Sequence, residues 1–168
     1  MIKKIIFIPV LIYLLSISLT TLHAQNTHWS TLDYSYSKGP VSPEYQFNYR
    51  IIITEDRNGI LVYTNSSSTK DYNFKVGKST FKKIKKQLTA CDVFSVNPDE
   101  MKSDKNLIGG PISELTVTMW QPPDVDAKPT MIVIPSQLNE KYSESFNKLY
   151  DLLENSVPNS IWEKARMQ

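Results

Sequence analysis

Apolar and polar residues alternate along part of the chain, and this alternation predicts strands. Between residues 45 and 54 every second side chain is aromatic or aliphatic, as a strand with one buried face requires. The polar stretch after it ends in Asn58-Gly59, a pair suited to positive backbone angles, before residues 60–63 become apolar again. These segments predict a hairpin. A third strand is expected at residues 72–76, and residues 32–37 could add an extra one.

Two later segments repeat their apolar residues at helical spacing. Residues 79–90 are expected to form a helix capped by Ser79, because a serine hydroxyl can accept a hydrogen bond from a free backbone amide at that end. A second helix is expected over residues 139–154, ending before Pro158, with Ile161-Trp162 folding back on the core. The apolar stripes of the two helices are Phe81, Ile84, Leu88 and Cys91, and Tyr142, Phe146, Leu149 and Leu153.

A second hairpin completes the expected elements. Gly109-Gly110-Pro111 marks a turn into a strand at residues 112–120, and a proline-containing loop separates it from a partner at residues 130–134. Strands joined by short turns are antiparallel, and two amphipathic helices need a sheet face to cover. The sequence therefore predicts an α+β fold, a two-layer sandwich of an antiparallel sheet of about 5 strands with two helices packed on one face.

The first 24 residues have the pattern of a signal peptide. Lys3 and Lys4 precede an apolar run at residues 5–19 that is shorter than the roughly 20 residues needed to span a bilayer. Cleavage is expected between Ala24 and Gln25, with an uncleaved N-terminal anchor as the alternative. Residues 25–168 are then expected to form one exported domain, periplasmic or secreted, with no stable membrane insertion after cleavage.

Charge argues against nucleic acid as a partner. Without Lys3 and Lys4, residues 25–168 hold 17 basic and 17 acidic side chains. Proteins that bind phosphate backbones by charge normally gather a basic excess on one face. The local run of lysines is interpreted as the water-facing side of the first helix, with a contact for an acidic partner as the alternative; it comprises Lys75, Lys78, Lys82, Lys83, Lys85 and Lys86.

Candidate chemistry is sparse after the signal peptide. One histidine, His28, and one cysteine, Cys91, cannot supply the several ligands of a usual zinc site, so no metal or other cofactor is expected. A Cys-His pair would require the N-terminus to fold back, and Cys91 is interpreted as a small buried hydrophobe. Loop carboxylates leave a hydrolase as the alternative function; the candidates are Asp99, Asp104, Asp124 and Asp126.

The most suggestive side chains share one face of the expected sheet. If Tyr45, Phe47 and Tyr49 face the helices, the residues between them face outward, and so do alternate residues of the 112–120 strand. This outer face would combine polar groups with one large aromatic, as binding sites for sugars and peptides do. The alternative is that residues 29–36 fold over this face and bury it. The candidate ligand-binding residues are Asn48, Arg50, Thr116, Thr118 and Trp120.

The order of these motifs resembles that of small exported bacterial proteins grouped as domains of unknown function. The resemblance rests on a hairpin, a helix that opens with Phe-x-x-Ile, an Ile-Gly-Gly-Pro turn, a second hairpin, and a helix followed by Ile161-Trp162. It implies an exported two-layer domain and assigns no functional residue. The leading interpretation is a non-enzymatic binding module for an envelope component, a partner protein or a polysaccharide. An inhibitor or immunity protein of an exported enzyme is a further alternative.

Overall fold

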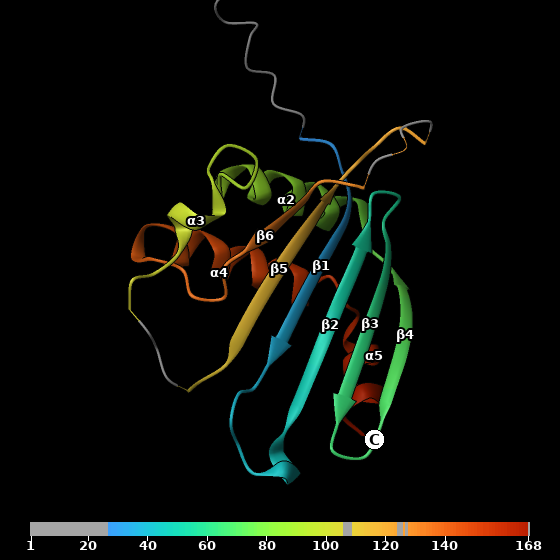
Figure 1. The fold of residues 1–168 in the computed structure, drawn as a ribbon. Coiled ribbons are helices and arrows are strands. Elements are labelled where there is room, and N and C mark those ends of the chain that lie inside the picture. Colours follow the sequence, from blue (N-terminus) through green and yellow to red (C-terminus); the bar gives the residue numbers. More distant parts are fainter. Residues whose placement is uncertain (1–26, 106–108, 124–125, 127, 168) are drawn as a thin grey trace, which may run out of the picture.

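Six antiparallel strands form one sheet in the computed structural model, which describes residues 27–105, 109–123, 126 and 128–167 (Figure 1). Their order across the sheet is β4-β3-β2-β1-β5-β6, one strand more than the sequence predicts. The predicted signal peptide lies outside the described residues. The strands are β1 (Trp29–Ser37), β2 (Phe47–Thr54), β3 (Asn58–Asn65), β4 (Thr69–Lys75), β5 (Ile112–Met119) and β6 (Met131–Ile134).

The first strand lies inside the sheet. Tyr34 of β1 is paired with Ile51 of β2 on one side and with Leu115 of β5 on the other. The extra strand expected near residues 32–37 is therefore confirmed. The alternative in which this segment covers the outer face of the sheet is wrong, because both edges of β1 are engaged in strand pairing within the sheet.

The helices lie on one side of the sheet, behind the strands in Figure 1. They are α2 (Lys78–Ala90), α3 (Pro98–Met101), α4 (Glu140–Glu154) and α5 (Asn159–Arg166), with a 3-10 turn, η1 (Pro43–Tyr45), before β2. The apolar stripes predicted for the two long helices pack into the core; Ile84, Leu88, Phe146 and Leu149 are fully buried. The lysines expected on the water-facing side of the first helix are exposed. The α+β sandwich is confirmed.

The chain after Pro158 forms a helix where the sequence suggested only a return to the core. Trp162 of α5 contacts Tyr49 edge-on, with ring centroids 4.9 Å apart. The hydroxyl of Tyr72 on β4 also donates to the Lys164 carbonyl at 3.4 Å. As a result α5 lies on the same face of the sheet as α2 and α4, behind strands β2 to β4 (Figure 1). None of the helices in the described part is long and apolar enough to cross a bilayer.

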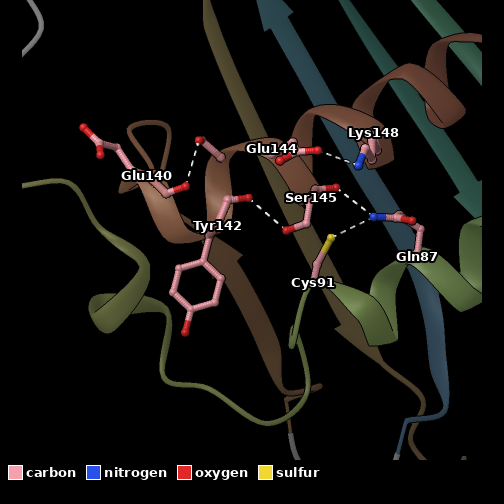
Figure 2. Close-up of polar contacts among 8 residues, drawn as sticks. Gln87, Cys91, Glu140, Tyr142, Glu144, Ser145 and Lys148 are labelled. Carbon is pink, nitrogen blue, oxygen red and sulfur yellow. Dashed lines mark hydrogen bonds and ion pairs between the residues drawn. The ribbon is translucent and has the colours of Figure 1, made fainter.

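The two long helices meet at Gln87, as Figure 2 shows. The side-chain amide of Gln87 donates to the Ser145 carbonyl at 2.9 Å and lies 3.8 Å from the Cys91 sulfur. Cys91 is fully buried, and this burial raises the pKa of its thiol. A buried, protonated thiol is a poor nucleophile. Cys91 therefore serves the core, as its place on the apolar stripe predicted.

The first helix begins earlier than predicted. Gly77 occupies the N-cap position of α2, and the Phe81 amide donates to its carbonyl at 2.9 Å. Ser79 therefore lies within the first turn, and no side chain caps this end. Val76 is fully buried at the end of β4, so the chain turns into the helix directly after it.

Tyr45 also departs from the predicted strand pattern. It belongs to the 3-10 turn η1 and is 62% exposed, so it does not face the helices. The apolar and polar residues alternate in sequence from residue 45, but their side chains alternate between the two faces of the sheet only from Phe47, where β2 begins.

Gly59 lies within β3, not in the turn that its pairing with Asn58 predicts. The positive backbone angle falls on Arg57, whose φ is 69°. Gly59 is instead needed because the ring of Phe74, its partner on β4, lies against it where a side chain would be.

Gly59→Ala is expected to lower the free energy of unfolding by about 1 to 3 kcal/mol, because the added methyl group overpacks the site and displaces the Phe74 ring. Chemical denaturation would measure this change. Phe74→Leu in the same background should recover part of the loss. An unchanged midpoint in Gly59→Ala would show that the ring moves aside freely.

Candidate functional site

The outer face of the sheet carries the residues that the sequence singled out. Asn48 and Arg50 alternate with the buried residues of β2, and Thr116 and Thr118 do the same on β5. Because the buried residues of both strands face the helices, these four side chains point to the opposite side. Trp120 directly follows β5. No helix of the described part covers this face (Figure 1).

The five candidates are spread along the length of the face. On β1, Asn48 pairs with Ser37 while Thr118 pairs with Thr31, a separation of roughly 20 Å along the strand. Asn48 and Arg50 line a shallow hollow of about 440 Å³. Thr116 pairs with Asp33, the partner of Arg50, and Thr118 and Trp120 lie further along, so one small ligand cannot contact all five.

Arg50 of β2 forms an ion pair with a residue of the neighbouring strand β1. Its guanidinium forms two parallel hydrogen bonds with the Asp33 carboxylate of β1, one of them from Nε to Oδ1 at 2.6 Å. These bonds raise the pKa of Arg50 further above its ordinary value. The bidentate pair neutralises both charges and holds the Arg50 side chain over β1. Arg50 therefore shapes the hollow but is not a free receptor for an anion.

Trp120 packs against His28, which itself contacts a carboxylate. Its ring stacks on His28 with centroids 5.0 Å apart and an interplanar angle of 14°, and it is 36% exposed. His28 in turn contacts the Glu55 carboxylate at 2.7 Å. His28 is thus held on the surface while Cys91 is buried between α2 and α4. The structure does not bring the two together, and the Cys-His hypothesis is wrong.

The structure adds two residues that sequence analysis missed. Met131 and Val133 of β6 are 60% and 56% exposed, and they are the strand partners of Thr118 and Thr116. Their alternation with Ile132 and Ile134 was a signal, but an apolar run does not show which side is bare. We define the β5–β6 surface as Thr116, Thr118, Trp120, Met131 and Val133.

The two edges of the sheet differ in charge. Strand β4, at one edge, exposes Lys70, Asp71 and Lys75. Strand β6, at the other edge, has the uncharged sequence Met-Ile-Val-Ile, and no strand of the described part pairs with its outer side. Charged side chains, especially lysines, commonly protect an edge strand from pairing with another chain. Only the β4 edge has this protection.

Three of the four predicted carboxylates lie in the described part of the chain. Asp99, Asp104 and Asp126 are exposed, and Asp124 lies outside the described residues. Among the described residues, no three histidines, cysteines or carboxylates lie close enough together to hold a metal ion.

A different pair of carboxylates lines a cavity of about 310 Å³ next to α5. They are Glu154 and Glu163. The Glu154 carboxylate accepts hydrogen bonds from the hydroxyls of Tyr49 at 2.6 Å and Tyr34 at 3.0 Å. Glu154 therefore joins α4 to the central strands of the sheet.

Comparison with known proteins adds no assignment. No family model matches the sequence, and no curated protein matches it. The resemblance to exported domains stays a prediction, and the function has to be argued from the geometry above.

Proposed function

We propose that the chain is an exported binding module, periplasmic or secreted, that holds an extended segment of a partner protein against β6. The observation that supports this proposal is the uncharged β6 edge beside exposed Met131 and Val133. An edge strand offers a row of backbone donors and acceptors, which an extended peptide can pair with as an added strand.

The β5–β6 surface would supply the side-chain part of the contact. A seventh strand beside β6 places its own outward side chains next to Met131 and Val133. Trp120 and Met131 are residue types enriched at protein interfaces. The backbone pairing would provide affinity, and these apolar side chains would select a partner segment with alternating apolar residues.

A protein segment fits this surface better than a polysaccharide does. Trp120 is the one tryptophan on the β5–β6 surface, and its stacking on His28 occupies one face of its ring. Met131 and Val133 on the same surface are apolar and exposed, which suits an apolar peptide side chain. A partner that is itself an exported enzyme would make the domain an inhibitor or immunity protein, so this alternative belongs to the same proposal.

Val133→Lys is expected to weaken partner binding at least about tenfold, because a lysine on an edge strand disfavours pairing with an added strand and removes the apolar contact with the partner's side chains. Binding partners would be captured from the envelope and culture fluid of the source cell with the unchanged protein and then purified for affinity measurement. The matched control is Asn73→Lys, which places the same side chain on the same face of the other edge strand. Val133 is largely exposed, so both variants should fold normally.

Hydrogen exchange locates the contact. The partner should slow exchange of the backbone amides of β6 in the unchanged protein and in Asn73→Lys. A partner that binds Val133→Lys with unchanged affinity, or that leaves β6 exchange unaltered, would refute the proposed mode.

The hydrolase alternative keeps one supporting observation, the cavity that contains Glu154 and Glu163. It would require carboxylates other than those that the sequence suggested. Two tyrosine hydroxyls donate to Glu154, which favours a role in stabilising the fold. The stability of the Glu154→Ala variant separates this role from catalysis.

A further inference from the structure

A second cavity, of about 530 Å³, lies where the start of β5, the segment after β6 and α4 meet. This volume is within the range of small-molecule sites. None of the described residues that line the cavity is charged. The lining residues with polar side chains are Ser113, Ser136, Ser143, Tyr150, Gln137 and Asn147.

Tyr150 is the feature that points to a ligand. Its side chain is 8% exposed, and its hydroxyl has no hydrogen-bond partner in the described part of the chain. The ring is held in place by stacking on Tyr34 at 4.9 Å and by contact with Phe146 at 6.0 Å. A phenylalanine would make these ring contacts without leaving a buried polar group unpaired. The hydroxyl therefore costs stability unless it bonds to a bound molecule.

Other parts of the wall are positioned by the fold. The Ser113 hydroxyl lies 3.4 Å from that of Tyr34, which donates to Glu154. On the loop side, Gly39 packs so closely against the Gly110 carbonyl that a side chain on Gly39 would overlap with it. This contact holds Pro40, a lining residue, next to the glycine turn that leads into β5.

We propose that this cavity binds a neutral, hydroxyl-rich ligand of one or two sugar units. Hydroxyls and side-chain amides both donate and accept, as the hydroxyls of a sugar do. A charged ligand would find no counter-charge among the described lining residues, and an apolar ligand would leave the buried Tyr150 hydroxyl without a partner. Pro111 and Leu138 supply apolar surface for the C–H groups of a sugar ring.

The test is a titration of the purified, isotope-labelled protein, followed by NMR, with glucose, galactose, N-acetylglucosamine, maltose and cellobiose. At least one sugar should cause saturable shifts confined to residues 109–113, 136–138 and 143–150. Tyr150→Phe should weaken that binding about tenfold while its thermal stability stays equal or rises. The matched control is Tyr45→Phe, the same change at an exposed tyrosine that does not line the cavity.

Several outcomes would overturn the proposal. They are no saturable shift with any of the sugars at concentrations up to ~10 mM, equal affinity in Tyr150→Phe, or tighter binding of glucuronate than of glucose. Binding of a neutral peptide in place of the sugars would also count against it. If Tyr150→Phe proved unstable, Asn147→Leu on the exposed side of α4 would provide the same test. Sugar binding should survive Val133→Lys, so the two proposals fail independently.

Discussion

Raising the pH above about 10 is expected to destabilise the fold steeply, because three buried tyrosines must stay protonated in it. Burial raises the pKa of Tyr34, Tyr49 and Tyr150, and the Glu154 carboxylate raises it further for the first two. In the unfolded chain these phenols lose their protons near pH 10, so the unfolded state binds fewer protons above this pH. The stability that they contribute is complete below the unfolded pKa and is lost as the pH rises above it.

The expected loss is about 1.4 kcal/mol for each tyrosine at one pH unit above the unfolded pKa, or about 4 kcal/mol for the three. Urea denaturation at pH values between about 8 and 11 would measure it. Tyr150→Phe should make the dependence on pH shallower, since this variant loses the ionisable group and keeps the ring. Tyr45→Phe, at an exposed position, should leave the pH dependence unchanged. A free energy of unfolding that stays constant through this range would contradict the expectation.

Glu154→Ala is expected to lower the free energy of unfolding by about 3 kcal/mol near neutral pH. The change removes the acceptor of the Tyr49 hydroxyl and the closer acceptor of the Tyr34 hydroxyl, and both tyrosines are buried. A buried hydroxyl without a partner costs about 1 to 3 kcal/mol. Tyr49 loses the acceptor of its hydroxyl, whereas Tyr34 keeps the longer contact with Ser113.

The matched control is Glu144→Ala, on the same helix. Glu144 forms an exposed ion pair with Lys148 at 2.7 Å, and its removal should have little effect. Glu154→Gln keeps one oxygen as acceptor and should recover part of the stability. A Glu154→Ala variant as stable as the unchanged protein would remove the structural role of this carboxylate and favour the hydrolase alternative.

The fold could be predicted largely because its periodic segments are long. The alternation in β2 and the stripes of α2 and α4 each extend over enough residues to define a buried face. The position of β1 could not be predicted, because a strand pattern does not show which strands lie on either side. Residues 159–166 were missed as a helix because they are short and directly follow a proline. The sequence placed Gly59 in a turn, because a local pattern does not show that Phe74 of a neighbouring strand packs against it.

The candidate site could be predicted only in part. Alternation correctly placed Thr116 and Thr118 on the outer face, since side chains on a strand change sides at every residue. It did not show that Arg50 forms an ion pair with Asp33, because this pair joins two strands that the sequence does not place side by side. The lack of a strand beside β6 and the unpaired Tyr150 hydroxyl both depend on the positions of distant segments, which a local sequence pattern does not contain.

The place of β1 between β2 and β5 has a consequence for folding kinetics. Strands β2 to β4 are connected by short turns and can pair early, as can β5 with β6. The two groups are joined only through β1, whose Tyr34 must find Leu115 roughly 80 residues further along the chain. Such high contact order slows folding. Only α2 is available early to cover the apolar side of the sheet, and α4 and α5 lie at the end of the chain, so the core closes only when almost the whole chain is available.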